Sequence, residues 1–216
     1  MAKYSRATFG SISGTVNNAV GTSWRGVDYL RNVAKKSSKG PSVGQLTVQA
    51  KLILAANMLA RIKNVLNLGF SDKKLNKLSG YNAAVRQFIL NAVTGEHPDF
   101  SVDYAKVQLS RGSLNQLKGV TFAQSEGVLT LSWSSREDAI LGNADDEILV
   151  LLYNSTDDEF MTNMSGKRAD GELIVELTES ADSNIEFWLF CVSKDRKSVS
   201  TSQYIGNFTM PPLVSI

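Results

Sequence analysis

Apolar side chains recur every three or four residues between positions 42 and 93, a spacing that predicts α-helices. The stripe of the first stretch, residues 42–68, consists of Leu52, Ala55, Leu59, Ile62 and Leu66. The stripe of the second stretch, residues 71–93, consists of Leu75, Leu78, Tyr81, Val85, Phe88 and Ala92. Because only a short connection around Gly69 separates the two stretches, we expect an antiparallel helical hairpin over residues 41–98.

Beyond Pro98 the hydrophobic period changes to two, which is typical of β-strands. The candidate strands are residues 101–109, 119–124, 127–134, 146–154, 159–166, 172–178, 184–193 and 198–209. This regular succession of short strands predicts an immunoglobulin- or fibronectin-III-like β-sandwich over residues 113–216, with residues 99–112 as a connecting strand. Both faces of the stretch from Ile185 to Val192 are apolar or aromatic apart from Glu186, which indicates a central strand.

Residues 1–40 are rich in Gly and Ser and alternate small or polar residues with apolar ones. They predict a basic arm of two short strands or extended segments around a turn. Such a pair has little core of its own, so another surface must cover Ile12, Val16, Trp24 and Leu30. The expected fold class is α+β: the extended arm and the helical hairpin form one part, and the sandwich forms the other.

The charge of the chain is divided between its two halves. The 216 residues carry a formal net charge of only +2. Residues 1–120 hold 17 basic and 5 acidic side chains, whereas residues 121–216 hold 6 basic and 16 acidic ones. The near-neutral total therefore conceals a basic half and an acidic half, which points to association through complementary surfaces.

The residue inventory limits the possible chemistry. Cys191 is the single cysteine, so an intrachain disulfide and a cysteine-based zinc site are excluded. His97 is the single histidine, which excludes a histidine pair. No apolar stretch approaches the ~20 residues of a membrane span, and residues 10–23 contain no apolar signal-peptide region. We expect synthesis in the cytoplasm without a signal peptide, and no membrane span.

The candidates for catalysis and metal binding each have a simpler interpretation. His97 lies between Glu96 and Pro98, where it could act as an oriented base or could be an exposed residue after a helix. Cys191 lies between apolar residues of a strand, which favours a buried structural thiol. The glycines at positions 10, 14, 21 and 26 fit neither a P-loop nor a dinucleotide fingerprint. The sequence therefore predicts no enzyme, no catalytic residue and no cofactor.

Two acidic triplets flank the predicted strand 146–154. They consist of Asp145, Asp146 and Glu147 before it, and Asp157, Asp158 and Glu159 after it. Opposite ends of one strand are too far apart to build a single metal site, although one triplet alone could contribute to Ca²⁺ binding. A solvated acidic loop is the simpler interpretation, and such a loop offers an acidic partner surface.

The basic arm carries the candidate interaction residues, which are Arg6, Trp24, Arg25, Tyr29, Arg31, Lys35, Lys36 and Lys39. These side chains could dock on the acidic sandwich of a neighbouring copy, in a head-to-tail contact that generates a ring or a filament. They could instead neutralise phosphates and stack on the bases of a nucleic acid. A third possibility is that the arm folds back on its own chain.

Several short motifs carry a resemblance to a known family. They include the segment Val20-Gly21-x-x-Trp24-Arg25-Gly26, then Tyr29-Leu30-Arg31, and near the other end Ser200-x-Ser202-x-Tyr204-Ile205-Gly206. Together they resemble an uncharacterised family of Bacteroidota proteins with a domain of unknown function. The resemblance implies no activity to carry over. Its layout is similar to that of phage and prophage proteins, which implies a structural role.

From these observations we expect a non-enzymatic assembly subunit that self-associates through its basic arm, with copies of itself or other structural subunits as partners. The resemblance implies a place in a phage virion or a phage-like particle. The alternative is a nucleic-acid-associated protein that binds through its basic N-terminal half.

Overall fold

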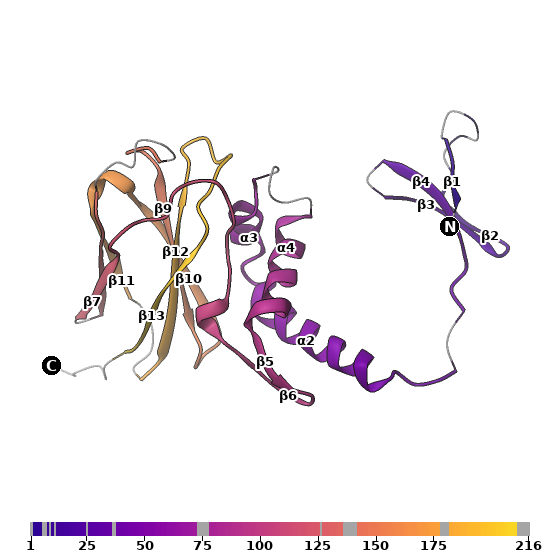
Figure 1. Ribbon diagram of the computed structural model, residues 1–216, viewed down its shortest axis with the longest axis horizontal. Helices are drawn as coiled ribbons and strands as arrows, with labels where there is room; N and C mark the ends of the chain where they lie inside the picture. The colour runs from indigo at the N-terminus through magenta and orange to yellow at the C-terminus, as the bar shows by residue number, and fades with distance from the viewer. Residues whose placement is uncertain are drawn as a thin grey trace. The chain divides into compact units, whose positions relative to one another are not determined.

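The chain forms two compact units, Met1–Ser42 and Val43–Ile216, which we describe separately (Figure 1). The computed structural model describes residues 2–5, 8, 10, 12–24, 26–35, 38–72, 78–125, 127–135, 142–177 and 182–210. The first unit contains most of the predicted arm, and the second contains the helices and the sandwich.

The N-terminal unit is a four-stranded antiparallel sheet with the strand order β1-β4-β3-β2. Its strands are β1 (Ala2–Lys3), β2 (Gly14–Val16), β3 (Ala19–Trp24) and β4 (Val27–Asn32). The sequence predicts only two strands here, because the short strands β1 and β2 offer too few alternating positions to be recognised. Among the described residues of this unit only Gly21 and Asp28 are buried, so the sheet has almost no core.

The helical region is more broken than the predicted hairpin. Its elements are α2 (Val43–Leu59), α3 (Lys63–Gly69), α4 (Gly80–Gln87) and the π-helix η1 (Phe88–Ala92). The single helix expected over residues 42–68 is wrong, because the chain bends by 94° between α2 and α3. This bend lets Leu59, Ile62 and Leu66 reach one common core.

The end of the second predicted helix is also corrected. After η1 the chain forms a hairpin of β5 (Val93–Glu96) and β6 (Asp99–Val102), with Pro98 in its turn. The strand expected over residues 101–109 is limited to the end of β6. A 3₁₀ turn, η2 (Tyr104–Lys106), follows it, and its last carbonyls and amides are used within the turn rather than in a sheet.

The β-sandwich expected from the strand spacing is confirmed. Its strands are β7 (Thr121–Ser125), β8 (Val128–Ser132), β9 (Glu147–Asn154), β10 (Glu159–Lys167), β11 (Glu172–Glu176), β12 (Asn184–Val192) and β13 (Gln203–Thr209). One antiparallel sheet has the order β10-β9-β12-β13, and the other has the order β11-β8-β7. The chain is therefore α+β, as its sequence predicts.

The central strands β9 and β12 are buried on both faces. Alternate residues such as Val150 and Leu189 point to the three-stranded sheet and form the core between the sheets. Their neighbours, such as Leu151 and Trp188, point to the helices and share a core with Leu59. Figure 1 shows the resulting three layers, with α3 and α4 beside the four-stranded sheet. The helices thus belong with the sandwich and not, as expected, with the arm.

Candidate functional site

One face of the N-terminal sheet is covered by the chain that connects β1 to β2. The hydroxyl of Tyr4 donates to the carbonyl of Ile12 at 3.3 Å and accepts from its amide at 3.1 Å, which holds this segment against the sheet. A Cβ at Gly21 would lie 2.6 Å from Ile12 Cγ2, so only glycine permits this close approach. Asp28, which alternates to the same face as Gly21, is buried.

The opposite face of this sheet is open and combines cations with aromatic rings. Residues paired across antiparallel strands share a face, so Lys3 lies beside Tyr29, and Trp24 and Arg31 lie on the same side of the sheet. Trp24 is 64% exposed, and Lys3 and Arg31 are also exposed. We call these four residues the basic-aromatic face.

The remaining candidates of the arm are distributed differently. Lys35 and Lys39 are exposed in the segment that follows β4, so they are not part of the sheet. Arg6, Arg25 and Lys36 lie outside the described residues. The structure therefore unites Trp24, Tyr29 and Arg31 of the predicted set on one face, and adds Lys3 from β1 to them.

The first acidic triplet is not the open acidic surface that its sequence suggests. Asp146 is buried and forms an ion pair of 3.3 Å with the buried guanidinium of Arg168, so its assignment to a partner surface is wrong. The other two members are exposed or half-buried but are neutralised within the chain. Asp145 pairs with Lys167 and Lys194, and Glu147 pairs with Arg196.

The second triplet retains more of its negative charge. Asp158 pairs with Arg61 at 2.7 Å and accepts a hydrogen bond from the Tyr153 hydroxyl at 3.0 Å. Burial, followed by this bond to a carboxylate, raises the pKa of Tyr153 above its usual value. Asp157 accepts from Asn154 at 2.9 Å, and Glu159 is exposed at the start of β10. One cation thus faces three carboxylates at this turn.

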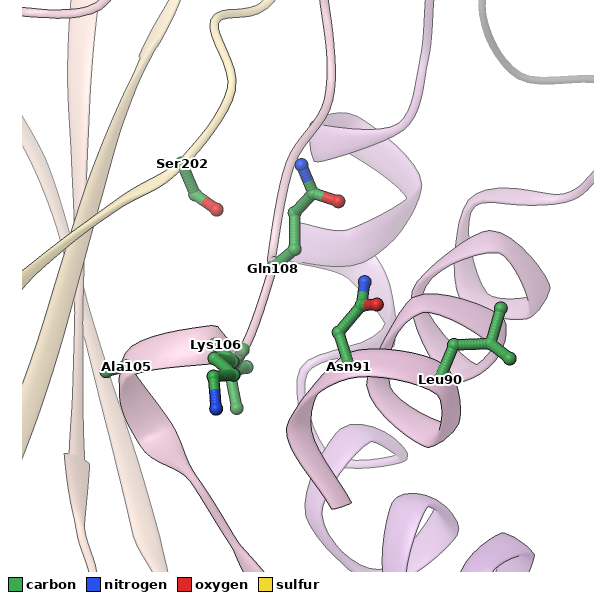
Figure 2. Close-up of a pocket in the computed structure, with 7 residues that line it drawn as sticks. Leu90, Asn91, Ala105, Lys106, Gln108 and Ser202 are labelled. Atoms are coloured by element: carbon green, nitrogen blue, oxygen red, sulfur yellow. The ribbon is translucent and has the colours of Figure 1, made fainter. Parts of the chain in front are cut away.

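A groove of about 570 Å³ lies in the Val43–Ile216 unit between η1, η2 and the chain before β13. Figure 2 shows the amides of Asn91 and Gln108 and the ammonium group of Lys106 around it. Ser202, also in the lining, accepts from the amide of Leu109 at 2.9 Å. These groups can hydrogen-bond to a polar ligand, but the lining contains no carboxylate, imidazole or thiol to serve as a base.

The sequence candidates for catalysis occupy ordinary structural positions. His97 is exposed in the turn between β5 and β6, with its ring edge-on to Phe100 at 6.4 Å. Cys191 is buried in β12, and burial raises the pKa of its thiol to about 11. Among the described residues, no group of three His, Cys, Asp or Glu side chains is arranged to hold a metal ion.

A second exposed surface, on α2, was missed by sequence reasoning. Leu52 was expected in the core but is 49% exposed, and Val43, Val48 and Ile53 are still more exposed. The signal was present, since α2 has apolar residues on every side. Within the described residues no single helix is long and apolar enough to span a membrane; α2 and α3 would pass that test only as a pair joined at the 94° bend.

The comparisons with known proteins reveal the family but not an activity. No curated protein matches the chain. A solved structure described as a myokine covers 46% of this chain and 99% of its own, at 13% identity and a TM-score of 0.37. The fibronectin III domain of human collagen alpha-1(XX) covers 50% of this chain and 97% of its own, at 11% identity and a TM-score of 0.37. A family model matches residues 11–206, and the chain therefore belongs to DUF6266, a family of unknown function.

Proposed function

We propose that the chain is a non-enzymatic subunit of a multi-copy assembly, and that the N-terminal sheet of one copy docks on a neighbouring copy. The observation that carries the proposal is the pair of unlike faces on this sheet. The Tyr4–Ile12 segment covers one face, whereas the basic-aromatic face remains open with Trp24 64% exposed. An exposed Trp beside Arg is the composition of a binding hot spot.

The small core of the N-terminal unit also favours a partner. An isolated sheet of short strands is marginally stable in water, because it buries too little apolar surface to offset the entropy of ordering its chain. Only Gly21 and Asp28 are buried among its described residues. Docking the open face on another surface would bury Trp24 and Val27 and thereby stabilise the sheet.

The charges favour a second copy as that partner. Residues 1–42 hold seven basic side chains and one acidic one, whereas residues 43–216 hold 16 basic and 20 acidic ones. The turn of Asp157, Asp158 and Glu159 is the best acceptor, because the first triplet is neutralised by Lys167, Lys194 and Arg196. Such a contact joins unlike surfaces, so repetition generates a ring or a filament.

The setting that we propose, a phage or phage-like particle of Bacteroidota, rests on the family resemblance alone. Negative-stain images of the purified chain test it. Rings or filaments of regular diameter would support an assembly subunit, and dispersed single particles at high protein concentration would contradict it.

Arg31→Gln combined with Trp24→Ala tests the docking face directly. Light scattering should show a large fall in assembly mass for this double variant. Arg86→Gln combined with Ile174→Ala is the matched control, because it removes an exposed cation and an exposed apolar side chain elsewhere. Equal masses for the double variant and the control would contradict the proposal.

Nucleic-acid binding is a second candidate, favoured by the net positive charge of residues 1–42 beside an exposed indole. Gel-shift affinity for single-stranded DNA should then fall steeply with salt, because bound counterions are released on binding. Replacing Lys35, Lys36 and Lys39 with Gln should flatten that salt dependence. The absence of a shift at low salt would exclude this candidate.

A further inference from the structure

The helix α2 exposes a regular apolar stripe on the side that faces away from its core. We call Val43, Leu46, Ala50, Ile53 and Asn57 the α2 seam. Val43, Leu46 and Ile53 are 71%, 38% and 60% exposed. At about 100° per residue, the buried residues Ala55 and Leu59 lie on the opposite side of the helix. The seam is therefore separate from the surface that packs on the sandwich.

The spacing of the seam is that of a coiled coil. Its residues follow one another at intervals of three, four, three and four, which are the a and d positions of a heptad repeat. Asn57 occupies an a position, where a single asparagine commonly fixes the register of two paired helices. An exposed apolar helix face without this spacing would not favour another helix as its partner.

We propose that the α2 seam pairs with the α2 seam of a second copy. The seam carries no charge, and the single charged residue of α2, Lys51, lies over the Phe100 ring of its own chain at 5.1 Å. Two identical seams therefore meet without like-charge repulsion. A charged partner would find no counter-charge on this face, and a helix on a lipid surface would carry Lys or Arg on a polar face that α2 lacks.

The folded core lowers the cost of this pairing. An isolated helix of 17 residues must first nucleate, whereas α2 is already held helical by Met58 and Leu59 in the core. The helix spans about 25 Å, little more than two heptads. Because so short a seam buries a small area, the dimer should dissociate on dilution.

This contact is independent of the basic-aromatic face. It buries no charge, so added salt should not weaken it, whereas the contact proposed for the N-terminal sheet weakens as salt rises. Either interaction can therefore fail in an experiment without the other. If both form, a two-fold contact at α2 would join chains that the N-terminal sheet links head to tail.

Sedimentation equilibrium of the full chain at high salt tests the seam. The mass should rise with protein concentration from 23.5 kDa towards twice that value. Ile53→Gln should raise the concentration needed for dimerisation by at least about tenfold, which corresponds to about 1.4 kcal/mol. Ile174→Gln is the control, because Ile174 is 59% exposed on β11 and Ile53 is 60% exposed. Circular dichroism verifies that both variants keep the helices.

Cross-linking gives a second readout. Ile53→Cys should form a covalent dimer under mild oxidation, whereas Ile174→Cys and the wild type, whose Cys191 is buried, should not. A mass of 23.5 kDa at every concentration would overturn the proposal, as would equal effects of Ile53→Gln and Ile174→Gln. Flotation of a monomeric wild type with phosphatidylcholine vesicles, lost in Ile53→Gln, would assign the seam to lipid and also overturn it.

Discussion

Replacing Asp146 with Ala should destabilise the sandwich strongly, although Asp146 belongs to a run of acidic residues that reads as a surface loop. The carboxylate lies 3.3 Å from Arg168 Nε, and the side chains are 1% and 7% exposed. Arg168 also donates to the Asn115 carbonyl at 2.7 Å, and its own carbonyl accepts from the Trp133 indole at 2.9 Å. The pair thus joins the loop before β9 to the 3₁₀ turn η3 (Arg168–Asp170) and to the segment before β7.

The expected cost follows from the charge that remains. Without Asp146, the buried guanidinium of Arg168 keeps only the Asn115 carbonyl as a described partner. Breaking a buried ion pair in this way costs about 3–5 kcal/mol. For a domain of this size, a loss of that magnitude lowers the melting temperature by about 6–20 °C.

Urea unfolding followed by the fluorescence of Trp133 and Trp188 measures the effect. Asp145→Ala is the control, because its carboxylate is 58% exposed and its two ion pairs lie at the surface. That variant should change the free energy of unfolding by less than about 1 kcal/mol. Replacing both partners with apolar residues, as in Asp146→Leu with Arg168→Met, should recover part of the lost stability. An Asp146→Ala protein as stable as the Asp145→Ala control would refute the reasoning.

Three further predictions concern the helical layer, the thiol and the N-terminal sheet. Leu59→Ala should cost about 2–5 kcal/mol in urea unfolding, because a fully buried side chain is lost where α2 meets the sheet; an unchanged midpoint would show that the layers do not share a core. Burial raises the Cys191 pKa to about 11, so stability should be constant below about pH 8.5, where the unfolded thiol begins to ionise, and fall as the pH rises towards 11; the Cys191→Ala variant should lose this alkaline decline. Gly21→Ala should disrupt the N-terminal sheet, because the new methyl would lie 2.8 Å from the Ile12 carbonyl, whereas Gly40→Ala meets nothing within 4 Å; equal amide exchange in β3 for both variants would contradict this.

The sandwich could be predicted because its central strands have apolar residues on both faces. The runs from Ile148 to Tyr153 and from Ile185 to Val192 are too short and too rich in branched and aromatic residues to favour helices. Their burial from both sides follows directly from that pattern. The helical boundaries could not be predicted equally well, because α2 is apolar on every side and spacing alone does not locate the bend after Leu59.

The candidate site was predicted in its residue types more than in its arrangement. Trp24, Tyr29 and Arg31 were candidates from composition, but their common face depends on the pairing of β3 with β4. The role of Asp146 could not be read from the sequence, because its partner Arg168 lies 22 residues away in another turn. A run of three acidic residues gives no local signal that its middle member is buried.

The most direct test of an assembly subunit is the mass of the full chain by light scattering at about 0.05 M and about 0.5 M salt, which changes the screening length severalfold. We predict a mass several times 23.5 kDa at low salt that falls markedly at high salt, and a loss of the larger species when residues 1–40 are deleted. A mass of 23.5 kDa at both salt concentrations, with or without those residues, would contradict the central claim.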